Sequence, residues 1–284
     1  MPTLQSVRVV TDSTACVPQA WCQEGNISVV PLLVAFGEEV FRDGVDLTPE
    51  EFYRRLTEGD VLPVTSQPPV GAFQDVYGQL VDEGHAVVSI HLSSGLSGTV
   101  ASAQAAANEF PGADIRVIDS RTVSMAFGWA VVAAARAAAA GLDADTVEKV
   151  AQDVLARSRF LCMLDTLEYL YKGGRIGKAS SLLGALLAIK PVVSVDGVVV
   201  PVEKPRTRRA ALQRIAQMVR QDAPLDHLCL AYTRDEDNAR ALGALLEDVV
   251  DPREVLYVEG GPVLGTYGGP GAVAACYVVR KRSQ

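Results

Sequence analysis

Residues 86–109 read AVVSIHLSSGLSGTVASAQAAANE, and this stretch decides the fold class. Its first part, 86–91, contains valine and isoleucine and predicts a buried strand. Residues 98–109 are rich in alanine and predict a helix. Hydroxyl side chains and glycines at 93–99 connect the two elements. A strand that leads through a short loop into a helix is the repeating unit of an α/β protein with a parallel sheet.

The same alternation covers the chain as far as residue 157. Strands are predicted at 6–11 and 115–119, and residues 29–41, interrupted by Gly37-Glu38, predict a hairpin or two short strands. Helices are predicted at 49–57, 70–82, 125–140 and 144–157. The first of these helices has a clear start at Thr48-Pro49-Glu50-Glu51, because threonine suits the cap and proline the first helical position. We therefore expect an N-terminal domain, 1–157, with a parallel sheet and crossover helices.

After residue 157 the pattern changes to that of a mixed sheet. Asp196-Gly197 joins two β-branched runs and predicts a hairpin, because both positions tolerate positive φ. Strands are predicted at 160–164, 190–195, 198–202, 228–232, 254–258 and 272–279. Helices are predicted at 207–220 and 235–246, and a glycine-basic loop at 171–178 leads into a short apolar helix. We expect a second α/β domain, 158–284, with a ligand between the two domains.

The composition is that of a globular chain with a substantial core. Of 284 residues, 49% are hydrophobic and 21% are charged, which argues against disorder. The formal net charge of −8 disfavours non-specific binding to nucleic acid or to anionic lipid. The most apolar stretch, 125–140, contains Arg136 and is shorter than the roughly 20 residues that a spanning helix needs. No stable membrane insertion is expected.

The sequence contains no signature of export, of a metal site or of a cofactor site. The N-terminus lacks a basic start followed by an apolar run, so we expect a cytoplasmic protein. No G-x-x-x-x-G-K-[ST] loop and no His or Cys pair at ligand spacing occurs. The cysteines form no C-x-x-C pair and are expected to be reduced core thiols: Cys16, Cys22, Cys162, Cys229 and Cys276.

Hydroxyl side chains follow several of the predicted strands. They lie at 11–14, at 93–99 and at Ser120, and a further group at 65–68 precedes the helix predicted from residue 70. The stretch 93–99 has more hydroxyls and glycines than a helix cap needs. Ligands of open α/β sheets bind at the carboxyl ends of the strands, so this edge suits an oxyanion. Arg175 and Arg206 in the second half are candidate cations, because a guanidinium binds a carboxylate or phosphate bidentately.

Acyl ester hydrolysis by Ser97 is an alternative function. Gly95-Leu96-Ser97-Gly98 approaches the nucleophile elbow G-x-S-x-G, but the second glycine comes one place too early. His85, His91 and His227 are the possible imidazole bases, and none has an evident acidic partner in the sequence. We interpret them as core or surface histidines.

Several motifs, in this order along nearly the whole chain, resemble those of the DegV family. They include TSQP at 65–68, SSGLSGT at 93–99, KGGRIG at 172–177 and PRTRR at 205–209. Each motif alone is weakly specific, but their order is specific. The resemblance implies a long-chain fatty acid enclosed in an apolar tunnel, and a role as carrier subunit of an ATP-dependent fatty acid kinase. That kinase makes acyl-phosphate for phospholipid synthesis. A lipid-loaded regulatory sensor is a further interpretation of the same site.

The resemblance also implies which residues form the site. Thr65 and Ser97 contact the carboxylate, and Arg175 supports them. The wider implied set adds Ser66, Thr266 and Tyr267 at the carboxylate, Ser94, Gly95 and Gly98 in the ligand loop, and Arg206 facing the kinase. No catalytic residue, metal or cofactor is implied for this chain.

One motif departs from the family pattern. Its usual form is G-T-H-x-G-P-G, whereas this chain reads GTYGGPG at 265–271. Tyr267 therefore takes the histidine position. A tyrosine can donate a hydrogen bond, but its ordinary pKa of about 10 lies far above the value of about 6.5 for histidine. We expect Tyr267 to lie near the head group without exchanging protons at neutral pH.

Overall fold

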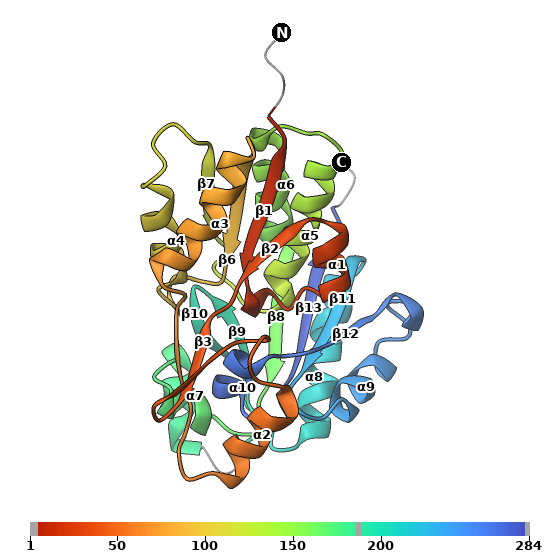
Figure 1. The fold of residues 1–284 in the computed structure, drawn as a ribbon. Coiled ribbons are helices and arrows are strands. Elements are labelled where there is room, and N and C mark those ends of the chain that lie inside the picture. Colours follow the sequence, from red (N-terminus) through yellow and green to blue (C-terminus); the bar gives the residue numbers. More distant parts are fainter. Residues whose placement is uncertain (1–4, 186–188, 282–284) are drawn as a thin grey trace.

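The N-terminal sheet consists of four parallel strands (Figure 1). The computed structural model describes residues 5–185 and 189–281. The strand order is β2 (Ile27–Val30), β1 (Val7–Asp12), β6 (Ala86–His91) and β7 (Ile115–Asp119). All four carboxyl ends therefore meet at one edge, as the sequence pattern predicts.

Helices cover both faces of this sheet. α3 (Val70–Asp82) and α4 (Thr99–Ala107) lie on one face, and α5 (Met125–Ala139) and α6 (Ala144–Arg157) lie on the other. Successive strand residues point to opposite faces. Val10 accordingly shares a core with Phe73 of α3, whereas Val9 shares a core with Met125 of α5.

The C-terminal sheet is mixed and has six strands. Their order is β10 (Val198–Glu203), β9 (Val192–Asp196), β8 (Ser158–Met163), β13 (Val273–Val279), β11 (Leu225–Tyr232) and β12 (Leu256–Glu259). β11 and β12 are parallel, and the other neighbours are antiparallel. The two sheets confirm the predicted α/β class.

Helix α5 lies between the two sheets. α8 (Arg208–Asp222) and α9 (Asp237–Ala244) cover one face of the C-terminal sheet, and α5 contacts the strands from the other side. Most residues of α5 are buried, and many are alanines, whose small side chains let both sheets approach the helix. Because α5 packs on both sheets, the domain division at residue 157 stays a prediction.

A third, small sheet is antiparallel. Its order is β4 (Glu39–Arg42), β3 (Leu33–Phe36) and β5 (Val64–Ser66). The β3–β4 pair confirms the hairpin expected within 29–41, with Gly37 at φ +61° in its turn. β5 corrects part of the prediction of a loop over 65–68 before the helix at residue 70, because Thr65 and Ser66 belong to a strand. Three residues are too few for an alternating pattern, and pairing with β3 makes this segment a strand.

Three short helices were not predicted, namely α1 (Gln19–Glu24), α7 (Glu168–Lys172) and α10 (Pro262–Gly268). They are too short for helical periodicity. α2 (Pro49–Glu58) starts as predicted, with the Glu51 N–H donating to Thr48 Oγ1 over 3.2 Å. Part of the expected apolar helix is a 3₁₀ helix, Gly177–Ala185, and residues 186–188 lie outside the described ones. Within the described ranges, no helix has the length and apolarity needed to cross a membrane.

Candidate functional site

An apolar cavity of about 130 Å³ lies between the C-terminal sheet and the carboxyl edge of the N-terminal sheet. The C-terminal strands contribute Phe160, Cys162, Val193, Val195, Val199 and Ala274, and the N-terminal half contributes Leu32, Leu92, Leu96 and Val123. Burial raises the pKa of the Cys162 thiol, so this side chain is neutral. The wall made by these residues is therefore suited to an uncharged hydrocarbon.

Most of the polar lining belongs to one group of segments. Thr65 and Ser66 come from β5, Ser97 from the loop after β6, Arg175 from the loop after α7, and Tyr267 from α10. These are five of the residues predicted at the carboxylate or in the ligand loop. The structure brings them together at one cavity, although their sequence positions span both halves of the chain.

Thr65, Arg175 and Tyr267 separate this cavity from a second one. The outer cavity has a volume of about 140 Å³, and these three residues line both cavities. Thr65 Oγ1 and the Tyr267 hydroxyl share a hydrogen bond of 2.5 Å between β5 and α10. The outer cavity is also lined by Tyr169, Lys172 and Thr266, among others. Its lining is more polar, so the three shared residues form a boundary between an apolar and a polar space.

Arg175 supplies the positive charge at this boundary. Its Nε donates to Leu96 O over 3.3 Å and its Nη1 to Gly173 O over 2.9 Å. The guanidinium carbon lies 5.2 Å from the centre of the Tyr267 ring. Among the described residues, no carboxylate forms an ion pair with Arg175. A guanidinium has five N–H donors, so donors remain for an anionic ligand.

Two glycines let the KGGRIG and GTYGGPG segments approach each other closely. A Cβ on Gly173 would lie 2.6 Å from the Tyr267 ring. Gly269, at φ +66°, similarly leaves room for the ring of Tyr169. The position of Tyr267 at the boundary therefore depends on the absence of side chains at these two glycines.

Asp43 holds the helix that carries Tyr267. The Val263 N–H at the start of α10 donates to Asp43 Oδ1 over 3.2 Å, and Gly261 packs against the same carboxyl group. Burial raises the pKa of Asp43. Asp43 was not predicted from the sequence, and its one signal there is the Asp43-Gly44 pair, which is typical of a turn.

The Ser93–Thr99 loop brings only part of its predicted set to the cavity. Ser97 lines the cavity, and its hydroxyl pairs with Thr99 Oγ1 at 2.9 Å. Ser94 instead donates to Asp119 over 2.5 Å, and Gly95 packs against Gly197 of the β9–β10 turn. These two residues shape the loop and do not line the cavity.

Three further predicted residues lie outside the inner cavity. Gly98 packs against the side chain of Gln67, which does line it. Thr266 is buried and donates to Pro262 O of its own helix over 2.9 Å, so it lines only the outer cavity. Arg206 is exposed at the turn between β10 and α8 and lines neither cavity.

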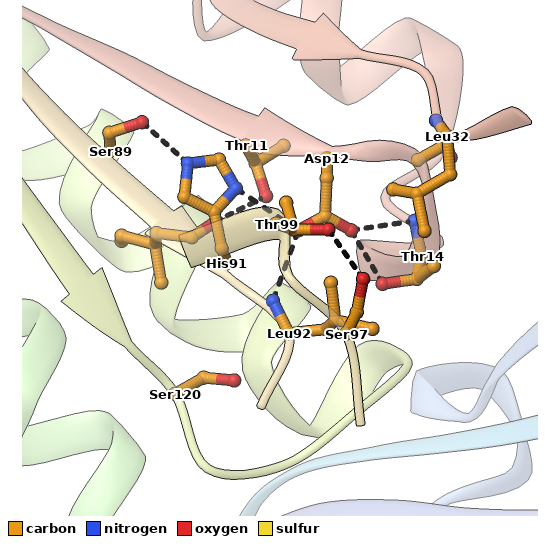
Figure 2. Close-up of polar contacts among 12 residues, drawn as sticks. Thr11, Asp12, Thr14, Leu32, Ser89, His91, Leu92, Ser97, Thr99 and Ser120 are labelled. Carbon is orange, nitrogen blue, oxygen red and sulfur yellow. Dashed lines mark hydrogen bonds and ion pairs between the residues drawn. The ribbon is translucent and has the colours of Figure 1, made fainter. Parts of the chain in front are cut away.

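A fully buried polar network lies beside this loop and was missed. His91 contacts Asp12 Oδ2 through Nδ1 at 3.0 Å and Ser89 Oγ through Nε2 at 2.7 Å (Figure 2). The Tyr77 hydroxyl donates to Ser89 Oγ over 2.7 Å. His91 is therefore a core histidine, one of the two interpretations given from the sequence, and Asp12 is the acidic partner that was not evident there. Asp12 and His91 are the last residues of two neighbouring parallel strands, and this strand order brings them together.

The hydrogen bonds of this network do not supply a base for the Ser97 hydroxyl. Figure 2 shows the His91 ring between Ser89 and Asp12, whereas the Ser97 hydroxyl pairs with Thr99. His91 is completely buried. Over residues 5–185 and 189–281, no three His, Cys, Asp or Glu side chains gather as a metal site. The cavity therefore combines an apolar space with hydroxyls and one guanidinium.

Comparisons with known proteins identify relatives over almost the entire chain. A family model described as "Uncharacterised protein, DegV family" matches residues 6–280. Protein DegV of Bacillus subtilis is 35% identical over 279 residues, which cover 96% of this chain and 99% of that protein. Two solved structures of DegV-family proteins are also similar to this chain.

The first, "Fatty Acid Binding of a DegV family Protein from Thermus thermophilus", is 32% identical to this chain with a TM-score of 0.91. It covers 97% of this chain and 100% of its own. The second, "Crystal Structure of DegV, a fatty acid binding protein from Bacillus subtilis", is 33% identical with a TM-score of 0.86 and the same coverage.

Proposed function

We propose that this chain, which belongs to the DegV family, binds one long-chain fatty acid. The hydrocarbon tail occupies the inner cavity, and the carboxylate lies against Thr65, Ser97, Arg175 and Tyr267. One observation carries the proposal. The wall of the cavity is largely apolar, and its one arginine, Arg175, has no carboxylate partner among residues 5–185 and 189–281. A molecule with a long apolar part and one anionic end fits this arrangement.

The energetics assign the affinity to the tail and the orientation to the head group. Burying about 15 methylenes at roughly 0.8 kcal/mol each gives a gross gain of about 12 kcal/mol. Association costs about 4 to 15 kcal/mol, so the net affinity is moderate. An ionised carboxylate loses solvation on burial, and Arg175 with the hydroxyls offsets that loss.

In this proposal the ligand carboxylate replaces the hydrogen bond that Thr65 and Tyr267 make to each other. A carboxylate placed beside them accepts from both hydroxyls and from the open donors of Arg175. Charge-assisted hydrogen bonds are stronger than neutral ones, so the exchange favours the ligand.

The finer proposal is that of a cytoplasmic carrier that presents the carboxylate to an ATP-dependent fatty acid kinase. It is supported by the outer cavity, which adjoins the head-group residues and contains Lys172, and by the exposed Arg206. Tyr267 replaces the family's usual histidine. We expect Tyr267→His to leave binding near its starting value and to raise acyl-phosphate formation when a kinase and ATP are supplied. Wild-type protein that supports phosphorylation as fast as the variant would contradict this reasoning.

The hydrolase alternative is not favoured by the hydrogen bonds. Ser97 needs a base to become a nucleophile, and its hydroxyl pairs with Thr99. A fluorophosphonate probe that labels the protein stoichiometrically, with loss of labelling in Ser97→Ala, would support the hydrolase. A regulatory sensor uses the same ligand site and differs only in its partner protein.

Mass spectrometry tests the binding proposal directly. Protein is purified, denatured and extracted with organic solvent, and the extract is examined for fatty acids at a molar ratio near one. Delipidated protein is then titrated with palmitate, stearate and oleate. Protein that is consistently empty and that also fails to bind in the titration would refute the proposal.

A further inference from the structure

The Asp12 carboxyl group joins the end of β1 to the end of β6 (Figure 2). Its Oδ1 accepts from the Thr14 N–H over 3.0 Å and from the Thr14 hydroxyl over 2.5 Å. Its Oδ2 lies 3.0 Å from His91 Nδ1 and accepts from the Leu92 N–H over 3.0 Å. Asp12 is completely buried, and these four contacts fill the acceptor sites of its two oxygens.

An acid buried at this place is costly, because a carboxylate loses its hydration on burial. In the part of the chain that the structure describes, no lysine or arginine forms an ion pair with Asp12. Ser89 and Tyr77 extend the network on the other side of the His91 ring, and both are completely buried. A buried polar network whose members are all satisfied makes a core rigid and specifies one arrangement. The network therefore contributes a fixed geometry at the ends of β1 and β6.

The geometry that this network fixes is that of the inner-cavity wall. Leu92 is the first residue after β6, its side chain lines the inner cavity, and Asp12 holds its backbone N–H. Leu32 lines the same cavity, and its N–H donates over 3.1 Å to the hydroxyl of Ser13, the residue after Asp12. Asp12 and His91 themselves line neither the inner nor the outer cavity. They can act on a ligand only through the residues that they hold.

We infer that His91 is a positioning residue for fatty acid binding: it holds the Asp12 carboxylate, which in turn holds Leu92 against the ligand tail. This inference rests on the proposed function and adds to it a residue that does not contact the ligand. Without the ring nitrogen, Asp12 Oδ2 keeps only the Leu92 N–H as donor, and the start of the 92–98 loop loses its fixed place. The tail then packs against a wall that moves, and the affinity falls for every ligand with that tail.

The test titrates delipidated wild-type protein, His91→Leu and His91→Asn with stearate and with octadecanol. Leucine removes both ring nitrogens, and His91→Leu should raise the Kd of both ligands by the same factor, about three- to tenfold. The amide nitrogen of asparagine takes the place of Nδ1 and can donate to Asp12, so His91→Asn should recover most of this loss. A purely structural role predicts the opposite order, because asparagine leaves a larger cavity and a polar group in the core. The unfolding midpoint of each variant is measured beside its Kd values.

Thr11→Val is the matched control. Thr11 is completely buried, and its hydroxyl joins the same two strands by donating to Ile90 O over 2.8 Å, but it lines neither cavity. The variant loses one buried hydrogen bond between β1 and β6 and should keep both Kd values. Asp12→Asn provides the measurement if His91→Leu fails to fold. It keeps the shape of the side chain with one acceptor oxygen fewer, and it should raise both Kd values by a similar factor.

The outcomes separate the two proposals. If wild-type protein does not bind stearate, the proposed function fails. If it binds stearate and His91→Leu and Asp12→Asn bind equally tightly, or if His91→Asn binds more weakly than His91→Leu, only the role of His91 fails. A loss for stearate without a loss for octadecanol would place the effect at the carboxylate and would also overturn the role given to Leu92.

Discussion

Replacement of Arg175 by alanine should weaken fatty acid binding and leave the fold intact. The guanidinium is the cation shared by the inner and outer cavities. Its Nε and Nη1 donate to the carbonyls of Leu96 and Gly173, and no carboxylate of the described residues pairs with it. A ligand carboxylate therefore meets donors that are already positioned by the protein.

The expected size of the effect follows from the number of interactions lost. One hydrogen bond to a charged group contributes about 1.5 to 3 kcal/mol. Since 1.4 kcal/mol corresponds to about a tenfold change in Kd, the Kd for stearate should rise by roughly 10- to 150-fold. Arg175→Lys keeps the charge and loses the planar fork, so its Kd should lie between those of the wild-type and alanine proteins.

The assay is a calorimetric titration of delipidated protein with stearate and with octadecanol. Octadecanol has the same tail without a carboxylate, so Arg175→Ala should bind it as tightly as wild-type protein does. Arg209→Ala removes an exposed arginine and should change neither Kd. An unchanged stearate Kd in Arg175→Ala, or an equal loss for stearate and octadecanol, would refute the assignment of Arg175 to the carboxylate.

Three other predictions follow from the structure. Tyr267→Phe should weaken stearate binding by about 0.5 to 1.5 kcal/mol in the same titration, because one hydroxyl donor is lost; equal affinity would contradict it. Gly173→Ala should lower both stability and affinity by about 1 to 3 kcal/mol, because its Cβ would lie 2.6 Å from the Tyr267 ring, whereas Gly184→Ala meets no atom within 4 Å and should have little effect. Burial, aided by Arg136, lowers the pKa of His227 below 6.5, so the folded state binds fewer protons there. Neutral His227 therefore contributes stability to the folded state above about pH 6.5, and this contribution is lost as the pH falls through the lowered pKa. Urea unfolding should therefore show a larger loss of stability from pH 7 to pH 5 in wild-type protein than in His227→Gln, and parallel curves would contradict this.

The long elements of this fold can be predicted from the sequence, and the short ones cannot. The predicted helices 70–82 and 144–157 and the strand 86–91 have the bounds found in the structure. Each has enough residues for its periodicity to show. β5 has three residues and α10 has seven, and both are fixed by pairing or packing with distant segments.

The same limit applies to the candidate site. Ser97 and Arg175 could be predicted because glycines and hydroxyls surround them in the sequence. The distance between Thr65 and Tyr267 could not, because it depends on β3, α2 and Asp43 to place β5 and α10. The pairing of Asp12 with His91 required the strand order β1-β6, which a single sequence does not give.

The place of β13 in the C-terminal sheet has a consequence for the order in which the molecule forms during synthesis. β13 (Val273–Val279) lies between β8 and β11, so the centre of that sheet is filled by its last strand. The parallel sheet needs residues only as far as 119, and N-terminal domains generally fold first during synthesis. The lining of the inner cavity includes both Thr65 and Tyr267, and Tyr267 comes 202 positions after Thr65 in the chain. If the chain binds a fatty acid as proposed, binding during synthesis requires almost all of the described residues, because the last strand and Tyr267 complete the cavity.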